Sequence, residues 1–490
     1  MEKRSIQYGI ISFSIVSFFL VLFLVDFGPG KFNAEIVAAA TISMAVLWMT
    51  EVIPLSATSL IPLIIFPLFG VLEANSIAQS YINSTIFLFI GGFIIALAME
   101  KWNLHKRVAL TVILWFGSSP SGVVLGFMIA TAFISMWISN TATALMVLPI
   151  GLAIMHKLED EYGKEDMLPF SKALMLGIAF ACTIGGIATL IGTPPNLVFL
   201  RVYSISFPEK PPILFGEWIK IALPISIVML IIFWYLIAKV FYPVKKGLEF
   251  DPVILRKEKE SLGKTTYEEK VVMTVFVITS LLWLFRVELD LGFIKIPGWS
   301  KLLPHYKLID DGTVAIMMAF LLFILPAKSD ESRRGYIIDN DVIKKVPWDI
   351  ILLFGGGFAI AEGFIKSGLS EIIGKQFIAL NGFPLIIIIG VICLVITFLS
   401  EVTSNTATAQ IALPVLASLA VQINTDPLLI MIPATIAASM GFMLPISTPP
   451  NAIIFSSERL KIIDMVKPGI FLDFICIVVI TLLSYLLLTF

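Results

Sequence analysis

Long uncharged stretches alternate with short charged segments along the chain. A helix rises about 1.5 Å per residue, so about 20 apolar residues span the hydrocarbon core of a bilayer. The stretches are too long for the strands of a membrane barrel, which favours an all-α polytopic membrane protein. We predict about eleven transmembrane helices from this pattern, near residues 6–27, 34–53, 54–72, 84–101, 172–203, 213–239, 271–287, 309–327, 349–366, 428–456 and 468–490.

The first stretch has the position of a signal peptide but not its length. Residues 5–25 carry no charge, and 21 residues in a helix extend about 32 Å, enough to cross a bilayer. The following residues 26–30 (DFGPG) indicate a helix end rather than a cleavage site. We therefore expect residues 1–33 to form a retained N-terminal transmembrane helix.

Two further apolar stretches, near 120–156 and 383–421, have polar residues in their middles. Neither is long enough for two comfortable crossings once its polar middle is counted. We predict that each enters the membrane and turns back as a re-entrant hairpin.

Composition supports the membrane assignment and narrows the function. Of 490 residues, 58% are hydrophobic and 14% are charged, with a mean hydropathy of +0.97, whereas an ordinary soluble chain has roughly 45–50% apolar and about 25% charged residues. These values exclude a soluble enzyme and a disordered chain. The net charge of −1 leaves no basic face for nucleic acid, and neither HExxH nor GxSxG occurs, so we expect no enzyme.

Cysteines and histidines indicate no disulfide, metal or cofactor framework. The cysteines, which we expect to be small core residues inside apolar stretches, are Cys182, Cys393 and Cys476. The histidines, which lie near charged segments and far apart, are His105, His156 and His305.

Basic residues predict the orientation of the helices. With a cytoplasmic N-terminus, 24 of the 34 Lys and Arg residues fall in cytoplasmic segments, as the positive-inside rule requires. Eleven crossings then place the C-terminus outside the cell membrane. Residues 241–270 mix basic and acidic side chains and are interpreted as a cytoplasmic linker. This linker divides the chain into a first repeat, 34–240, and a second repeat, 271–490.

The two halves share motifs at nearly fixed offsets. The sequence SNTAT occurs at 139–143 and again 265 residues later at 404–408, and TPPN occurs at 193–196 and 255 residues later at 448–451. The predicted crossings put the two SNTAT motifs on opposite sides of the membrane, so the repeats are inverted. Inverted repeats with interrupted helices are typical of secondary transporters. Duplication without a shared site would not explain two conserved pairs of polar motifs.

Each motif has a physical role at membrane depth. Ser and Asn favour helix N-caps, so SNT predicts the hairpin turn and the start of its second arm. Such a helix start presents free N–H groups and about half a positive charge, which suits an anion. The prolines of TPPN predict an unwound segment at 193–196 and another at 448–451. Neither motif contains Lys or Arg, so a bound dianion would need a second source of positive charge, and a sodium ion would supply it.

Four acidic residues lie at or near predicted span ends: Glu51, Glu100, Glu362 and Glu401. We interpret the first three as structural, with Glu362 paired to Lys366 one helical turn away. Glu401 lies three residues before Ser404, and both a structural and a functional role remain open for it.

At these motifs the sequence resembles the divalent anion/sodium symporter family of INDY-like di- and tricarboxylate transporters. The resemblance extends over nearly the whole chain and includes residues 49–54 (MTEVIP), 102–107 (WNLHKR), 136–141 (MWISNT) and 355–359 (GGGFA). It implies eleven spans, two re-entrant hairpins with SNT at their tips, a homodimer and an elevator-type movement of the hairpins.

The resemblance also implies which residues hold the ligands. The carboxylates of the substrate would meet Asn140, Thr141, Thr193, Asn405, Thr406 and Thr448. One sodium cluster would consist of Ser135, Ser139, Asn140 and Gly192, and the other of Ser400, Thr403, Asn405 and Ser447.

The leading hypothesis is sodium-coupled uptake of small dicarboxylates such as succinate, malate, fumarate and 2-oxoglutarate. The second is obligate dicarboxylate exchange on the same scaffold without sodium coupling. An anion channel is a third reading, because inverted repeats occur in channels too. The expected partners are dicarboxylate anions, the lipid bilayer and a second copy of the chain.

Overall fold

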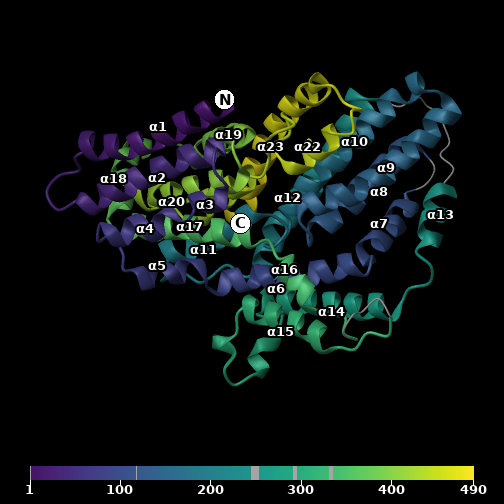
Figure 1. The fold of residues 1–490 in the computed structure, drawn as a ribbon, viewed down its shortest axis with the longest axis horizontal. Helices are drawn as coiled ribbons and strands as arrows, with labels where there is room; N and C mark the ends of the chain where they lie inside the picture. Colours follow the sequence, from purple (N-terminus) through teal and green to yellow (C-terminus); the bar gives the residue numbers. More distant parts are fainter. Residues whose placement is uncertain (1, 117–118, 244–252, 291–294, 330–334, 490) are drawn as a thin grey trace.

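The computed structural model describes residues 2–116, 119–243, 253–290, 295–329 and 335–489. Its secondary structure is almost entirely helical (Figure 1), which confirms the all-α prediction. The described residues contain two exceptions. Strands β1 (Leu289–Asp290) and β2 (Lys295–Ile296) form a short antiparallel ribbon, and Pro326 and Tyr336 form an isolated β-bridge.

The first half begins with helices that precede the first hairpin. These are α1 (Glu2–Leu24), α2 (Phe32–Thr50), α3 (Leu55–Thr58), α4 (Ile61–Leu68), α5 (Ala74–Tyr81), α6 (Ser84–Lys101) and α7 (Leu104–Trp115). The hairpin and the helices after it are α8 (Pro120–Ser135), α9 (Asn140–Tyr162), α10 (Lys164–Gly186), α11 (Pro194–Ser206) and α12 (Phe215–Tyr235), which continues as a π-helical segment, Leu236–Phe241.

The second half repeats this order. Before its hairpin come α13 (Val253–Ser261), α14 (Tyr267–Leu284), α15 (Asp311–Ile324), α16 (Asn340–Lys344), α17 (Trp348–Lys366) and α18 (Leu369–Gln376), with short 3₁₀ turns at Trp299–Leu302, Tyr306–Leu308 and Phe377–Leu380. The hairpin and the helices after it are α19 (Leu385–Val402), α20 (Asn405–Gln422), α21 (Leu428–Ala437), α22 (Pro449–Phe455) and α23 (Ile462–Thr489).

Within the described ranges, nine helices are long and apolar enough to cross a membrane, and four shorter apolar helices accompany them. The prediction of a single helix over 54–72 is wrong, because the chain divides there into α3 and α4. Pro62 follows the break, and a proline cannot donate the hydrogen bond that would continue the preceding turn. The linker 241–270 contains α13, while its residues 244–252 lie outside the described residues.

The two predicted spans that contain TPPN are interrupted rather than continuous. The span near 172–203 consists of α10 and α11, and the span near 428–456 consists of α21 and α22. Polar residues between the predicted hairpin and the next span are also helical, since α9 runs to Tyr162 and α10 starts at Lys164. The hairpin arms α9 and α19 are themselves long enough to cross a membrane.

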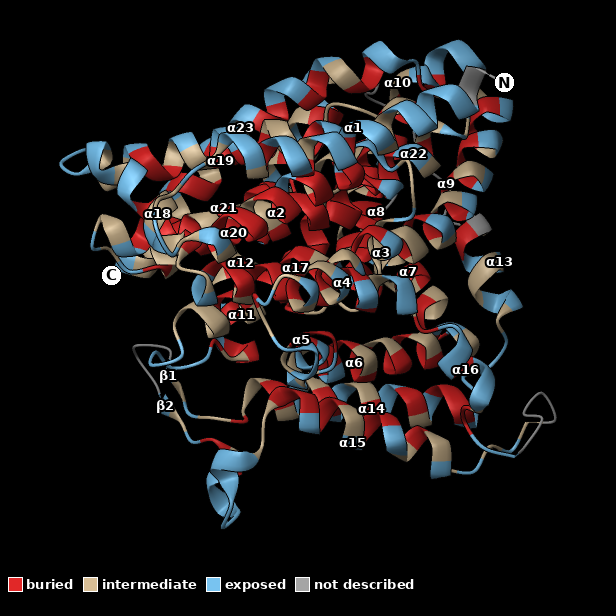
Figure 2. Ribbon diagram, turned by 60° about the vertical axis from the view of Figure 1, so that its left-hand side comes forward, coloured by how far each residue is buried: buried red, intermediate tan, exposed pale blue. Residues whose placement is uncertain are grey.

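Burial distinguishes the helices of the interior from those at the surface (Figure 2). Helix α10 is buried on nearly all sides, as expected for a helix that is apolar all round. It packs closely on α8, because a Cβ atom built on Gly185 would lie 2.2 Å from the carbonyl oxygen of Ala132. In contrast, large apolar side chains such as Phe13, Phe19 and Phe23 of α1 are exposed, which suits contact with lipid.

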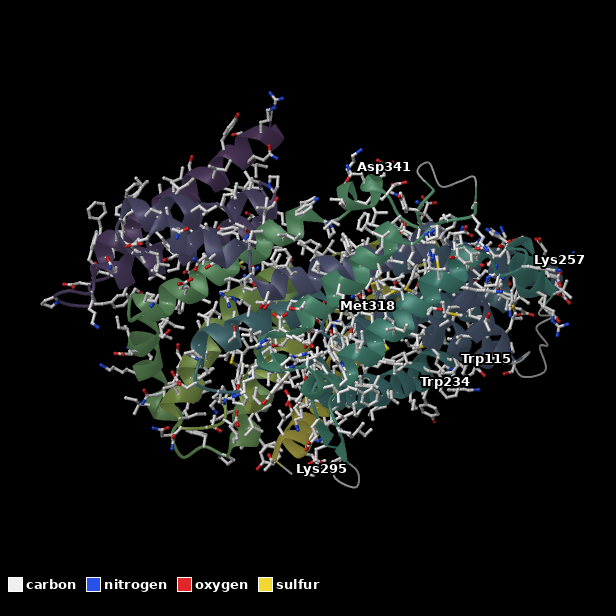
Figure 3. All side chains as sticks on the ribbon, turned by 90° about the horizontal axis from the view of Figure 1, so that it is seen from below. Trp115, Trp234, Lys257, Lys295, Met318 and Asp341 are labelled. Atoms are coloured by element: carbon white, nitrogen blue, oxygen red, sulfur yellow. The ribbon has the colours of Figure 1, made fainter. Side chains whose placement is uncertain are left out.

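The ends of the molecule carry different segments. In Figure 2 the N-terminus, α13 and α16 lie toward one end of the long helices, while the C-terminus, α18 and the β1–β2 ribbon lie toward the other. Figure 3 shows Trp115 and Trp234 near the edge of the molecule on the same side as Lys257 of α13. Trp115 is 74% exposed, and tryptophan is enriched where a membrane meets water.

Candidate functional site

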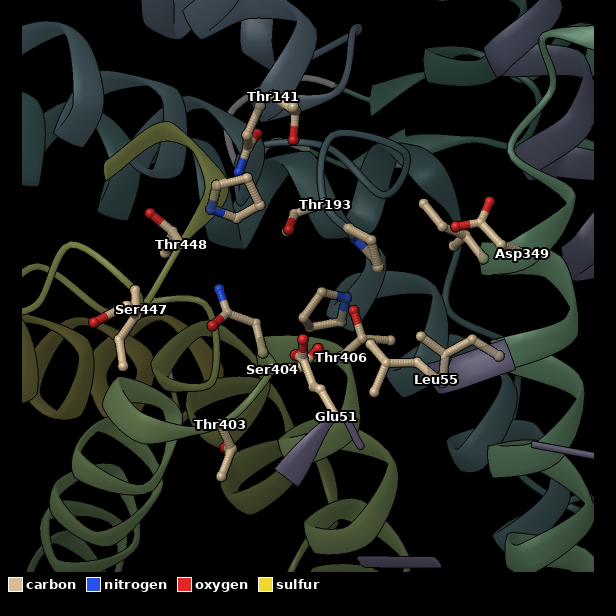
Figure 4. A pocket seen from close by; sticks show the side chains of 18 of the residues that line it. Glu51, Leu55, Thr141, Thr193, Asp349, Thr403, Ser404, Thr406, Ser447 and Thr448 are labelled. Atoms are coloured by element: carbon tan, nitrogen blue, oxygen red, sulfur yellow. The ribbon is translucent and has the colours of Figure 1, made fainter. Parts of the chain in front are cut away.

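The four repeated motifs meet at one cavity of about 730 Å³, shown from close by in Figure 4. Its walls include both SNT segments, both TPPN segments and, on another side, the α2–α3 connection and the start of α17. No Lys or Arg is among the described residues that line it. Of the twelve different residues in the predicted sites, those on the cavity wall are Ser139, Asn140, Thr141, Gly192, Thr193, Thr403, Asn405, Thr406, Ser447 and Thr448.

Each SNT motif stands at the start of a helix, α9 or α20, as predicted. Ser139 is the N-cap of α9, and its hydroxyl accepts a hydrogen bond of 3.2 Å from the backbone N–H of Ala142. Ser404 stands at the same place before α20. The first backbone N–H groups of a helix have no partner within the helix, so two helix N-termini meet the cavity.

Both TPPN motifs follow a break in a helix, also as predicted. Residues 187–193 separate α10 from α11, and residues 438–448 separate α21 from α22. Thr193 and Thr448 are the N-caps of the second pieces, and each has extended backbone geometry. The breaks add two further helix starts to the cavity wall.

The asparagine of each TPPN motif holds the break, a role that we did not predict. The Asn196 amide donates to the carbonyl oxygens of Gly186 at 3.3 Å and Thr189 at 2.7 Å. The Asn451 amide donates to those of Gly441 at 3.0 Å and Leu444 at 3.1 Å.

These carbonyls occupy corresponding positions at the 255-residue offset, so the hydrogen-bond pattern is itself duplicated. Both asparagines are fully buried. Each asparagine is the last residue of a TPPN motif and was therefore visible in the sequence. The sequence did not show which carbonyl oxygens its amide would reach.

Oxygen atoms of the first predicted sodium cluster lie close together. The Ser135 hydroxyl donates to the side-chain oxygen of Asn140 at 2.6 Å. A Cβ atom on Gly186 would lie 2.5 Å from that oxygen, and a Cβ atom on Gly192 would lie 2.4 Å from the carbonyl oxygen of Gly186. Glycine at both positions therefore lets these oxygens come close to the backbone of residues 186 and 192, as the ligands of a small cation would. Ser135 is buried behind the cavity wall.

The second predicted cluster repeats the first contact. The Ser400 hydroxyl is 2.8 Å from the side-chain oxygen of Asn405 and 2.6 Å from the carbonyl oxygen of Ala438. The Thr403 hydroxyl is 2.8 Å from the carbonyl oxygen of Leu399. Hydroxyl, amide and carbonyl oxygens are donors of the hard type that alkali cations prefer.

The structure revises the interpretation of the four acids. Glu51 lines the main cavity together with Asp349, although we expected a structural role. Glu362 does not pair with Lys366 in an ion pair; its carboxylate accepts a hydrogen bond of 2.9 Å from the Ser80 hydroxyl on α5. Lys366 is the last residue of α17 and is exposed.

Glu100 and Glu401 have different surroundings. Glu100 lines a separate cavity of about 290 Å³ with His105. The His105 ring nitrogen Nδ1 is 3.0 Å from the carbonyl oxygen of Met99. Glu401 is only 1% exposed and accepts hydrogen bonds from the α21–α22 break. Among the described residues no group of three His, Cys, Asp or Glu side chains forms a metal site, and the three cysteines are free and buried.

Comparison with known proteins agrees with this geometry. Residues 10–488 match the family model described as the sodium:sulfate symporter transmembrane region. The sodium-dependent dicarboxylate transporter SdcS of Staphylococcus saprophyticus is 42% identical over 99% of this chain and 93% of its own length. SdcS of Staphylococcus aureus strain NCTC 8325 is 44% identical over 92% of this chain and 85% of its own length.

Two solved structures share the fold at low sequence identity. Neisseria gonorrhoeae MtrF, described within a class of antimetabolite efflux pumps, aligns with a TM-score of 0.56 at 14% identity over 95% of this chain and 97% of its own. The Alcanivorax borkumensis YdaH transporter aligns with a TM-score of 0.54 at 9% identity over 86% and 87%.

Proposed function

Because the chain belongs to the sodium:sulfate symporter family, we propose that it carries small dicarboxylates across the cell membrane together with sodium ions. The substrates in this proposal are succinate, malate, fumarate and 2-oxoglutarate. The names of the two SdcS relatives, sodium-dependent dicarboxylate transporters, support it. The observation that carries it is the cavity in which four helix starts face one another without a basic side chain.

Charge balance explains why sodium accompanies the acid. Each helix N-terminus supplies about half a positive charge, and a dicarboxylate brings two negative charges into a site with few compensating groups. Burying such an anion is costly unless it is paired. Sodium ions at the two oxygen clusters would complete the pairing, so substrate affinity would depend on sodium concentration.

The proposed roles follow the duplicated motifs. One carboxylate of the substrate meets Asn140, Thr141 and Thr193, and the other meets Asn405, Thr406 and Thr448. One sodium ion is held by Ser135, Ser139, Asn140 and Gly192, and the other by Ser400, Thr403, Asn405 and Ser447. The duplicated contacts of Ser135 with Asn140 and of Ser400 with Asn405 support this assignment.

We also propose a transport cycle of the elevator type in a homodimer, with residues 120–156 and 383–421 as re-entrant hairpins of the inverted repeats. The hairpin tips and the TPPN breaks would move together past a wall that includes Glu51, Leu55 and Asp349. The N-terminus would be cytoplasmic and the C-terminus outside. The separation of α13 and α16 from α18 and the C-terminus in Figure 2 supports this orientation.

Uptake of labelled succinate and 2-oxoglutarate into proteoliposomes of purified protein tests the function. Two variables are crossed, namely an inward sodium gradient and unlabelled dicarboxylate inside the vesicles. We expect uptake that needs sodium and does not need internal substrate. Uptake that needs internal dicarboxylate and ignores sodium would identify an exchanger, and a steady anion current without saturable counterflow would identify a channel.

A further inference from the structure

The side chain of Glu401 reaches into the second helix break. Its carboxylate accepts hydrogen bonds from the backbone N–H of Met443 at 2.8 Å and of Leu444 at 3.0 Å. The Ser447 hydroxyl also donates to this carboxylate. Ser447 belongs to the second proposed sodium cluster, so Glu401 touches a residue of that cluster directly.

The first half has no equivalent charge. At the 265-residue offset the position of Glu401 corresponds to Met136, and at the 255-residue offset Leu444 corresponds to Thr189. Positions 136 and 189 also touch there, but through other, neutral groups, because the Thr189 hydroxyl donates to the backbone carbonyl of Met136. The two halves therefore share the geometry of the break but differ by one carboxylate.

A second buried acid faces Glu401 from α23. Asp473 is fully buried, and neither of its carboxylate oxygens has a well-aligned hydrogen-bond partner. It lies one helical turn after Gly469, where a Cβ atom would be 2.4 Å from the carbonyl oxygen of Phe442, so this part of α23 packs directly on the break. The groups that face Asp473 are the Glu401 carboxyl, the backbone of Phe442 and the thiol of Cys476.

No positive side chain balances these two acids. The elements packed on α23 are chiefly α19, α21 and α12, and among the described residues none forms an ion pair with Glu401 or Asp473. The surroundings are apolar, since the Phe442 ring packs on Phe180 and Phe233 with ring centroids 5.0 and 4.8 Å apart. An unpaired negative charge is destabilised in such surroundings, and a cation bound close to it would lower that cost.

From this asymmetry we infer that Glu401, supported by Asp473, is a positioning residue that makes the second-half sodium cluster the tighter of the two. The inference rests on the proposed sodium coupling and deepens it. Through Ser447 and the two backbone N–H groups, Glu401 fixes the break that supplies the cluster. Its negative charge also attracts the ion at short range, where the protein interior screens weakly. The first-half cluster has only neutral oxygens and fills at higher sodium concentration.

Sodium binding to purified protein without substrate tests the inference. The melting temperature is followed as sodium replaces choline at constant ionic strength, and the sodium concentration at which it begins to rise is compared among variants. We expect Glu401→Gln to raise this concentration by about tenfold or more, equivalent to about 1.4 kcal/mol per factor of ten. We expect Asp473→Asn to raise it by a smaller factor.

Three controls separate this role from a general loss of structure. Glu401→Asp keeps the charge and should stay closer to the wild-type protein than Glu401→Gln does. Glu362→Gln changes a half-buried acid on α17 that bonds Ser80, and it should leave the sodium dependence unchanged. In Glu401→Gln the KM for succinate at saturating sodium should change by a smaller factor than the sodium requirement does, because Glu401 does not line the cavity.

The outcomes distinguish this inference from the proposed function. The inference would be overturned if Glu401→Gln and Asp473→Asn both kept the sodium dependence of the wild-type protein. If sodium still drove uptake, the proposed function would stand. Absence of any sodium-dependent stabilisation in the wild-type protein, with uptake that ignores sodium, would overturn both. If Glu401→Gln does not fold, Asp473→Asn is compared with Glu362→Gln instead. The inference then requires that Asp473→Asn needs more sodium for stabilisation than the wild-type protein, while Glu362→Gln does not.

Discussion

At the scale of residues, the repeated motifs bring neutral polar groups to the cavity, and hydrogen bonds set the positions of several of them. Asn140 and Asn405, which the sequence analysis assigned to the site, line the cavity, and they could be singled out because Ser-Asn at a helix start is a local signal. It did not predict that Asn196 and Asn451 hold the two breaks, because their partners are carbonyl oxygens whose approach depends on how the chain bends. The network around Glu401 was unpredictable for the same reason.

Asparagine at the hairpin tips should be required for transport and not for folding. We expect Asn140→Ala or Asn405→Ala to reduce sodium-driven succinate uptake to background, because each change removes a side-chain oxygen and amide at the cavity. The melting temperature of the purified protein should stay close to that of the wild type. Undiminished uptake by well-folded protein carrying both changes would refute the site assignment.

Glycine beside a hairpin tip should be required for transport, because a larger residue would displace the side chains of the site. In Gly186→Ala the new Cβ atom would lie 2.5 Å from the Asn140 side-chain oxygen, which forces the amide out of place. We expect uptake to fall by about tenfold or more. Gly390→Ala in α19 is the matched control, since its Cβ atom would meet Thr481 at an ordinary 3.8 Å. Equal uptake by the two variants would contradict the crowding argument.

At the scale of elements, local chemistry predicted where helices start and stop. Caps and prolines located the hairpin turns and the breaks after α10 and α21, whereas the α3–α4 break and the full length of α9 and α10 were missed. The surfaces that two helices present to each other decide how closely they approach. A single sequence does not reveal which helices will be paired in this way. The close approach of α8 to α10 is an example.

The close approach of α8 to α10 should make the stability of the protein sensitive to any larger side chain at residue 185. Gly185→Ala would place a Cβ atom 2.2 Å from a backbone oxygen of α8, and a backbone cannot move aside as a flexible side chain can. Overpacking of this kind costs about 1–3 kcal/mol. We expect a melting temperature lower by several degrees, measured by following unfolding of the purified protein in detergent. Gly9→Ala on α1, where no atom lies within 4 Å of the new Cβ atom, should melt as the wild type does.

At the scale of the whole molecule, motifs more than 250 residues apart share one cavity because the two halves follow the same order of hairpin, broken helix and final long helix. The sequence predicted the convergence from the duplicated motifs. It could not predict that Glu51 and Asp349 form the facing wall, because neither belongs to a duplicated pair. The distribution of basic residues remains the basis for the orientation.

Reporter fusions test that orientation. Alkaline phosphatase, which is active only outside the cytoplasm, should be active when fused after residue 490 and inactive when inserted in α13 between residues 253 and 261. Green fluorescent protein should give the opposite result at the same two places. An active phosphatase within α13 would reverse the assignment of sides.

The volume of the cavity has a consequence for selectivity. Liquid water occupies about 30 Å³ per molecule, so about 730 Å³ holds on the order of twenty water molecules. A four-carbon acid, as in the proposed function, would fill only part of that space and could keep much of its hydration shell. Steric fit in this conformation would therefore not select for the length of the carbon chain. Discrimination between short and long acids would require a conformation in which the cavity is smaller and holds less water.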